Sequence, residues 1–428
     1  MRFYVILLAL GASLASAADK QPHTLTLHEA HAVALQKHPK ISVAELKALA
    51  AKQVVKQADA AFFPAVFGNV GAAAAAEPNT RIISNPLTMS SVFDRASASL
   101  NVSQLITDFG RSAHLEQSAA FKARAEEQNI EATRSQILLQ VDGAYIGALQ
   151  AQALVEVAQQ TLKTRGLLRD QVTALAKNQL KSDLDASFAE VNYQEAALLL
   201  SRSENDLQSS FATLAALLDD RKTTSYRLAP LSAPGKVNAE ASSLIGEALR
   251  ERPDLKKLRL ERDGAWKFAR AERDLSLPTV SVVGSAGTLP YRENSLNERN
   301  YAAGGISVNV PIFTGGLNSA RRKEAELRAQ AIESALKDEE TNVVRDVRIA
   351  LLSLHNADER TAITAKLLEQ AQKGENLADA RYQAGTTSMV ELGQAQLNLT
   401  AAQINEANAR YEYLLRRSIL DFQTGTLH

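Results

Sequence analysis

The stretch VSQLITDFG at residues 102–110 is followed, 206 residues later, by VNVPIFTGG at residues 308–316. The same offset aligns residues 102–214 with residues 308–420 and needs no gap. The chain is therefore built twice from one plan of about 200 residues, whereas solenoid repeats have periods of roughly 20–50 residues. Identical positions under this offset include Gly110 and Gly316, Val141 and Val347, Ala144 and Ala350, Leu162 and Leu368, Ser182 and Ser388, and Asn192 and Asn398.

Upstream of this block the offset is 214 residues, which places Pro64 on Pro278 and puts extra residues into the first copy before Val102. We expect two structural repeats, each with a helix, a β-hairpin and a long helical hairpin. A short tail would end the second repeat. The first repeat would span residues 18–218, a linker residues 219–242, and the second repeat residues 243–428.

The N-terminus and the composition indicate an exported protein. Arg2, the apolar residues 3–10 and the small residues 15–17 form a signal peptide pattern, so residues 1–17 would be removed. No other window approaches ~20 apolar residues, which argues against a transmembrane helix but leaves the weaker pattern of a β-barrel open. Basic and acidic residues number 48 each, so no net charge favours nucleic acid. The absence of cysteine excludes disulfides and thiol catalysis.

Most of the chain reads as helix. Residues 113–177 and 319–383 contain no proline and predict helices of about 100 Å each, at ~1.5 Å per residue. After a short break, helices of about 50 Å return over residues 183–217 and 389–420.

Each copy also begins with a helix, at residues 25–63 and 243–277, and a proline lies within its first part. Thr26 and Glu29 have the spacing of a capping box at the first of these helices. Two such shorter helices laid end to end match the length of one long helix, which suggests the wall of an α-helical barrel.

Apolar residues near the breaks step by four and three, the period of a coiled-coil seam. An antiparallel coiled-coil hairpin is the expectation for this part of the chain. The first seam comprises Leu154, Ala158, Thr161, Arg165, Leu168, Val172 and Leu175, and the second Val390, Gln394, Leu397, Ala401, Ile404, Asn408, Tyr411 and Leu415.

Two hairpins, at about residues 65–107 and 279–313, would supply four strands. Four strands cannot close a barrel, and an open sheet in lipid would leave its edge N–H and C=O groups unpaired. Several chains would have to share one barrel, and three chains would supply twelve strands. Alternation with polar neighbours marks the candidate lipid-facing residues Leu100, Val102, Ile306, Val308 and Val310.

The chain resembles the TolC-type outer-membrane efflux proteins over nearly all of its mature length. The resemblance rests on residues 25–39, on the junctions at residues 104–110 and 310–316, on Tyr382-Gln383-Ala384-Gly385-Thr386, and on residues 391–396. It implies a mainly α-helical fold with a small β part. Three chains would share a twelve-stranded β-barrel in the outer membrane of a Gram-negative bacterium and an α-helical barrel in the periplasm. It also implies a periplasmic adaptor (membrane fusion protein) and an inner-membrane pump or exporter as partners.

The same resemblance assigns roles to the helix breaks, whose ends would form a periplasmic gate. Asp185 and Glu391 would form rings of carboxylates that attract cations; the alternative is that both are acids favoured by a helix N-terminus. Gln394 occupies the place of a second acid, Tyr382 that of a tyrosine holding the closed state, and Thr387 that of its arginine partner. Adaptor docking would involve Asn178, Gln179, Leu180, Lys181 and Ser182 at the first break, which keeps only Leu180 of the family pattern, and Ala384, Gly385, Thr386 and Ser388 at the second.

No pattern for catalysis, metal binding or a cofactor stands out. His28 and His31 could share a metal, but no further ligand joins them, and no phosphate loop or nucleophile elbow is present. The leading hypothesis is a passive exit duct for small molecules or ions in a tripartite efflux system. The same architecture in type I protein secretion is the nearest alternative. A soluble periplasmic coiled-coil scaffold is the next, and an outer-membrane enzyme is a distant third.

Overall fold

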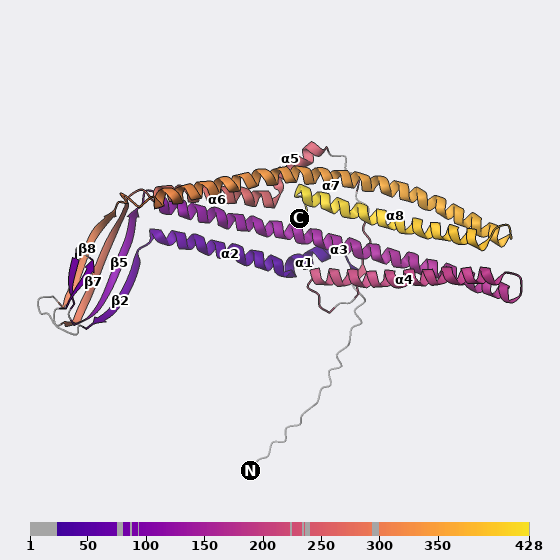
Figure 1. Cartoon of the computed structure of the whole chain (residues 1–428), viewed down its shortest axis with the longest axis horizontal. Coiled ribbons are helices and arrows are strands. Elements are labelled where there is room, and N and C mark those ends of the chain that lie inside the picture. Colours follow the sequence, from indigo (N-terminus) through magenta and orange to yellow (C-terminus); the bar gives the residue numbers. More distant parts are fainter. Residues whose placement is uncertain are drawn as a thin grey trace, which may run out of the picture. The chain divides into compact units, whose positions relative to one another are not determined.

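A computed structural model describes two compact units, in which α-helices predominate (Figure 1). The expected signal peptide lies outside the described residues. Unit 1 comprises residues 1–36, 140–235 and 360–414, and unit 2 comprises residues 37–139, 236–359 and 415–428. The structure describes residues 24–74, 80–85, 88–92, 94–222, 225–232, 235, 240–292 and 299–427.

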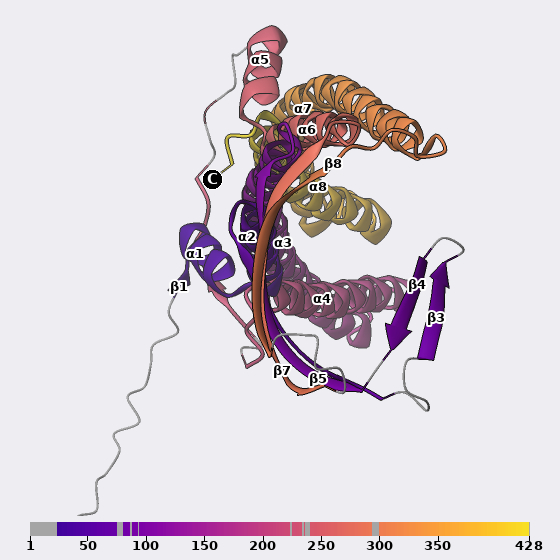
Figure 2. The ribbon, with the colours of Figure 1, turned by 90° about the vertical axis from the view of Figure 1, so that its left-hand side faces the viewer.

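Unit 2 contains an antiparallel four-stranded sheet with the strand order β2-β5-β7-β8. The strands are β2 (Ala65–Ala73), β5 (Arg95–Thr107), β7 (Thr279–Arg292) and β8 (Asn300–Asn309). β5 and β7 come from different repeats and join the two expected hairpins into one sheet. Figure 2 shows this sheet as a strongly curved strip. The four strands predicted from the sequence are thus confirmed as one open sheet.

Two further strand pairs were not predicted. β3 (Thr80–Asn85) and β4 (Thr88–Val92) form a separate hairpin in the part of the first repeat that carries the extra residues. β1 (Thr24–Leu25) and β6 (Arg227–Leu228) pair in parallel within unit 1. Tyr145 lies beside this pair, and its hydroxyl oxygen is 2.8 Å from the carbonyl oxygens of both Leu25 and Ala229.

The expectation that Val310 lies in a strand is wrong. β8 ends at Asn309, and Pro311 follows Val310. Proline has no N–H to donate to a ladder and restricts the residue before it, so the pairing stops one residue earlier than the alternation suggested.

The helices of unit 2 are α2 (Pro39–Asp59), α5 (Ala241–Glu251), α6 (Pro253–Asp274) and the first parts of α3 (Arg111–Lys177) and α7 (Leu317–Gln383). Pro39 and Pro253, at equivalent positions in the two repeats, each begin a new helix and so divide the expected first helix of each repeat in two. A core cluster joins α5 and α6 to α7. Its buried members are Ala248, Leu255, Leu336, Val343 and Val347.

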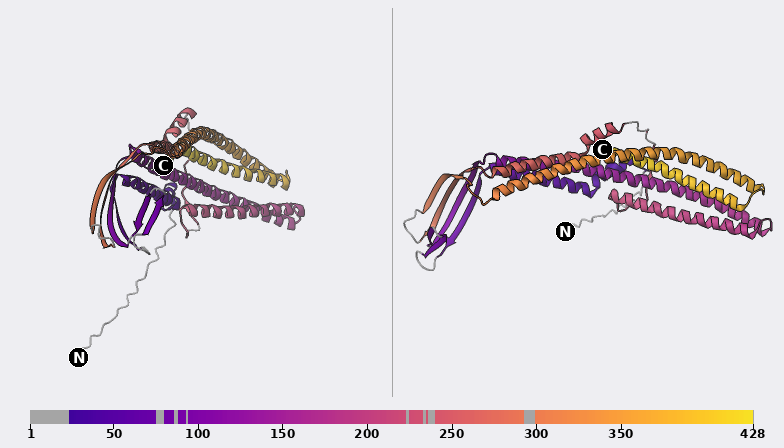
Figure 3. Two further views of the ribbon diagram at one scale, coloured as in Figure 1. Left: turned by 60° about the vertical axis from the view of Figure 1, so that its left-hand side comes forward. Right: turned by 45° about the horizontal axis from the view of Figure 1, so that its top comes forward.

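Unit 1 contains α1 (Leu27–Lys37) up to Gln36, α4 (Asp183–Leu217), the remainder of α3 and α7, and α8 (Met389–Thr424) up to Leu414. The hairpins α3–α4 and α7–α8 lie side by side, as both views in Figure 3 show. The capping box at α1 is present: Glu29 N donates to Thr26 Oγ1 (3.2 Å), and Thr26 N donates to Glu29 Oε2 (2.9 Å).

The seam predicted on α3 is confirmed near the break. Ala158 and Val172 are fully buried, and the two polar members, Thr161 and Arg165, are 8% and 5% exposed. Arg165 donates to the backbone oxygen of Asn192 on α4 (3.0 Å). The seam predicted on α8 is wrong at its start, because Val390 and Leu397 are exposed, whereas Met389, Leu392 and Gln396 are buried.

The long helices agree with the sequence expectation at both ends. α3 and α7 have 67 residues each, which corresponds to about 100 Å of helix. None of the helices in the described part of the chain is sufficiently long and apolar to span a membrane.

Candidate functional site

The two helix breaks have the same backbone conformation, although their sequences differ. Gln179 and Gly385 occupy equivalent positions and both have positive φ, 60° and 70°. In the first break Leu180 N donates to Leu175 O (3.0 Å), and in the second Thr386 N donates to Arg381 O (2.9 Å). This 6→1 bond with a left-handed residue is the Schellman ending of a helix. It reverses the chain tightly and exposes the residues between the helices.

The residues after each break cap the next helix, but the two acids bond differently. Ser182 and Asp185 form a capping box, in which Ser182 Oγ accepts from Asp185 N (3.1 Å) and Asp185 Oδ2 accepts from Ser182 N (3.3 Å). Glu391 N donates to Ser388 Oγ (3.3 Å). The carboxylate of Glu391, however, binds Arg381 Nη1 (2.8 Å) and the hydroxyl of Thr387. The positive charge of Arg381 therefore offsets the negative charge of Glu391.

The structure brings the two breaks together around Tyr382. The ammonium of Lys181 lies 4.3 Å from the centre of the Tyr382 ring, a cation–π contact between the two hairpins. Burial raises the pKa of Tyr382, and the negative charge of Asp185 raises it further, so the hydroxyl stays protonated at neutral pH. That hydroxyl is buried without a hydrogen-bond partner among the described residues. The surrounding core consists of Val172, Ala189, Ala378, Met389 and Leu392.

Most other residues expected at the gate and the tips face solvent. Gln394 is exposed, and its amide donates to Asn398 Oδ1 on the same helix (3.0 Å). Lys181 and Thr387 are half-buried, and Leu180 is 70% exposed. The further exposed residues of the two tips are Asn178, Gln179, Ser182, Ala384, Gly385, Thr386 and Ser388.

In unit 2, strand register gives the sheet one continuous apolar face. Val66 of β2 pairs with Val102, which pairs with Gly284, which pairs with Gly304. Directly paired residues point to the same side of a sheet, and alternate residues follow them. The large residues of this apolar face are Val66, Val70, Leu100, Val102, Val280, Val282, Ile306 and Val308.

The opposite face of the sheet is more polar, although Phe67 and Val283 also lie on it. It carries Ser99, Asn101 and Ser103 of β5 and Ser281 and Ser285 of β7. A hollow of about 320 Å³ lies on the sheet; Asn101, Ser103 and Ser285 contribute to its lining, but most of the lining surface is apolar and includes Phe67 and Val283. The curved sheet thus carries serine and asparagine side chains on one side and most of its large aliphatic side chains on the other.

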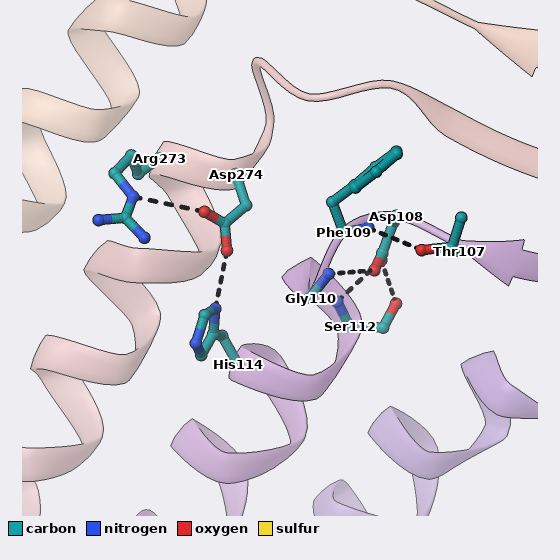
Figure 4. Close-up of polar contacts among 8 residues, drawn as sticks. All are labelled: Thr107, Asp108, Phe109, Gly110, Ser112, His114, Arg273 and Asp274. Carbon is teal, nitrogen blue, oxygen red and sulfur yellow. Dashed lines mark hydrogen bonds and ion pairs between the residues drawn. The ribbon is translucent and has the colours of Figure 1, made fainter.

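Exposed aromatic residues gather where the strands join the helices of unit 2. Asp108 caps α3 by accepting from Gly110 N (3.2 Å) and Ser112 N (2.8 Å), and the adjacent His114 Nδ1 lies 2.7 Å from Asp274 Oδ2 (Figure 4). This turn forces Phe109 to a φ of 55°. The equivalent residue in the second copy is Gly315, at 63°. The exposed large side chains at these junctions are Phe62, Phe63, Phe109, Ile312 and Phe313.

Comparison with protein families identifies the family to which this chain belongs. The sequence model of the outer membrane efflux protein family matches residues 32–219 and 244–426, that is, both copies of the repeat. The chain belongs to this family. TolC of Vibrio cholerae serotype O1 is 26% identical over 352 residues, which cover 78% of this chain and 77% of that protein.

Solved structures of efflux channels share the fold. The outer-membrane channel OprN superposes with a TM-score of 0.81 at 18% identity and covers 93% of this chain, which covers 89% of OprN. CusC superposes with a TM-score of 0.80 at 19% identity, with coverage of 94% and 93%. This outer membrane efflux protein resides in the outer membrane of a Gram-negative bacterium and belongs to a family of channel proteins.

The structure adds three residues of the efflux protein to the candidate functional residues that the sequence indicated. Arg381 binds Glu391, Phe109 carries the strained turn, and Phe313 is 89% exposed at the equivalent junction. Arg381 precedes the second break by three residues, but its sequence alone does not show that the chain turns back to place Glu391 beside it. For Phe109 the repeat held a signal, because it aligns with Gly315.

We predict that Tyr382→Phe leaves the thermal unfolding midpoint of the purified protein unchanged or slightly raised. Removing a buried hydroxyl without a partner loses no hydrogen bond. Tyr145→Phe is the matched control, because its hydroxyl lies 2.8 Å from two backbone oxygens, and its loss costs about 1–3 kcal/mol. An equal loss of stability in both variants would show that Tyr382 has a partner in the assembled protein.

Proposed function

We propose that this chain is one subunit of a homotrimeric, passive exit duct, the outer-membrane component of a tripartite efflux system. The duct would conduct small molecules or ions, and a periplasmic adaptor and an inner-membrane pump would supply the selection and the energy. The two repeats, residues 18–218 and 243–428, would each contribute one hairpin to a shared twelve-stranded barrel. The duct would carry out no catalysis.

The observation that carries the proposal is the open, two-faced sheet of unit 2. Among the described strands, β2 and β8 each pair on one side only. An apolar face suits lipid, the serine and asparagine side chains of the opposite face suit an aqueous pore, and the edges in lipid need partners. Joining β2 of one copy to β8 of the next satisfies all three conditions.

The exposed residues at the junctions support a membrane boundary there. Aromatic side chains flank the apolar band of transmembrane barrels at the level of the headgroups. Phe109 keeps a left-handed backbone that costs of order 1–3 kcal/mol for a residue other than glycine. A position of the Phe109 ring in the membrane interface would explain why this strained backbone is retained.

The periplasmic gate and the docking tips are a further part of the proposal. Asp185, Glu391 and Gln394 would line the constriction, while Tyr382 and Thr387 would hold its closed form. The exposed tips would contact the adaptor, with Leu180 as the apolar anchor of the first break. The capping bond of the Asp185 carboxylate supports the alternative that this acid serves the helix end, and a carboxylate at a cap can still face passing ions.

Engineered disulfides test the trimer directly, since the natural chain has no cysteine. One cysteine would be placed in β2, at Asn69, and a second would be moved along β8 from Tyr301 to Ser307 on the same polar face. Oxidation of the membrane-embedded protein should give covalent trimers for a cysteine pair in register. Monomers or open-ended ladders for every pair would contradict a closed ring of three.

Function is tested by conductance and by a deletion strain. The purified oligomer should form steady ion-conducting pores in planar bilayers. Deletion of the gene should raise sensitivity to small toxic compounds, with restoration by the intact gene. Loss of a secreted protein without any change in sensitivity would assign the duct to type I secretion instead. Absence of conductance together with a soluble periplasmic location would favour the scaffold.

A further inference from the structure

Unit 2 contains a cavity of about 610 Å³ between α2, α3, α6 and α7. Alanines from all four helices contribute to its lining, so small side chains leave space where larger ones would fill the wall. A volume of roughly 300–1,000 Å³ with a mainly apolar lining is typical of sites for small molecules. The alanines are Ala51 on α2, Ala119 and Ala125 on α3, Ala265 on α6 and Ala325 on α7.

A close contact between α3 and α6 shapes one wall of this cavity. Ser118 Oγ donates to the backbone oxygen of Gly264 (2.8 Å), and a Cβ at Gly264 would lie 3.3 Å from Ser118 O. Glycine therefore permits the two helices to approach. One turn further along each helix, this approach places the ammonium of Lys122 5.6 Å from the centre of the Phe268 ring.

Among the charged residues of the cavity lining, Lys122 and Glu126 form no ion pair in the part of the chain that the structure describes, and Glu126 instead accepts a hydrogen bond from Asn129. Arg328, on the opposite wall, is bound by Glu324 (2.6 Å). The two acids of the lining, Glu126 and Glu261, belong to one polar network. Its links are Glu126 to Asn129 (3.3 Å), Asn129 to Lys257 (3.1 Å) and Lys257 to Glu261 (3.8 Å).

We propose that this cavity binds a small amphiphile with a compact apolar body and one anionic group. The alanine-lined hollow takes the apolar body, the Phe268 ring packs against it, and the Lys122 ammonium pairs with the anion. Asn129 donates to Glu126, and Lys257 lies 3.8 Å from Glu261, so these contacts offset part of the repulsion between the two acids and the ligand. Binding is a property of unit 2 and holds whether the duct serves efflux or secretion.

The test uses a pair of probes with the same naphthalene body and opposite charge, naphthalenesulfonate and naphthylmethylammonium. The full protein is held in lipid nanodiscs. Isothermal titration calorimetry measures the binding of each probe to the embedded protein. We expect saturable binding of the sulfonate and at least about tenfold weaker binding of the ammonium, since a charged hydrogen bond contributes about that factor.

Three variants separate the cavity from the lipid around it. Lys122→Met should weaken sulfonate binding about tenfold, and Lys267→Met, the same change on α6 outside the cavity lining, should leave it within about twofold. Ala265→Leu should fill the space and reduce binding of both probes. Equal affinity for both probes, an unaltered Lys122→Met protein, or unchanged binding to Ala265→Leu would each overturn the proposal. Unaltered pore conductance in these variants would keep this result separate from the proposed duct.

Discussion

Replacement of Ile306 by arginine is expected to remove at least about 95% of the protein from the outer membrane. Ile306 lies in β8 on the apolar face of the sheet, 73% exposed in the single chain, and pairs with Val282. An arginine facing lipid near the midplane of a bilayer costs about 2–4 kcal/mol. Each 1.4 kcal/mol is a factor of about ten in an equilibrium, so inserted protein should fall at least about 30-fold.

The neighbouring residue supplies the matched control for this prediction. Ser307→Arg introduces the same side chain one position along β8, where it points to the polar face beside Ser281. Membrane fractionation with immunoblotting should show Ser307→Arg at nearly the natural level. Equal insertion of both variants would contradict the assignment of the two faces, and loss of the control alone would invert it.

The second large effect concerns the charge at the helix breaks. Because Arg381 neutralises Glu391, Arg381→Gln should raise the cation preference of the pore, and Glu391→Gln, which leaves Arg381 unpaired, should lower or invert it. A unit charge ~6 Å from an ion contributes about 0.7 kcal/mol even in bulk water, which is a factor of about three. Three copies of the site make at least a threefold change in permeability ratio the expected result.

Reversal potentials across a planar bilayer with a salt gradient measure this ratio. Arg360→Gln is the control, since Arg360 forms a similar exposed pair with Glu412 on the same two helices, away from the breaks. Opposite shifts for Arg381→Gln and Glu391→Gln, with none for Arg360→Gln, would support the gate. Identical selectivity in all four proteins would place the constriction elsewhere and leave the acids as helix caps.

The helices could be predicted closely because local chemistry ends them. Proline at the two kinks, the capping pair Thr26 and Glu29, and the glycine at position 385 all act within a few residues of the element they terminate. The repeat then provided a second, independent copy of each boundary. The long helices consequently agree with expectation to within two residues at their start.

Contacts between distant segments could not be predicted in the same way. The 3.5-residue period on α8 predicts an apolar stripe, but it does not predict which face of the helix packs within the chain. Val390 and Leu397, at the start of this stripe, are exposed. If the trimer forms, such a stripe is free to meet a neighbouring copy. Likewise, nothing in the local sequence shows that Lys181 stacks on Tyr382 or that Arg381 neutralises Glu391. Local sequence therefore does not predict that the charge of Glu391 is offset by Arg381.

In the described part of the sheet, the outer edges of β2 and β8 are unpaired, which has a consequence for biogenesis. A newly exported subunit presents two rows of free backbone donors and acceptors beside an apolar surface, the arrangement that templates aggregation. The unassembled subunit must therefore spend only a short time alone in water, or a chaperone must cover its strand edges until the other subunits bind. Overproduction without a matching supply of that chaperone should yield insoluble β-rich deposits before it yields more pores.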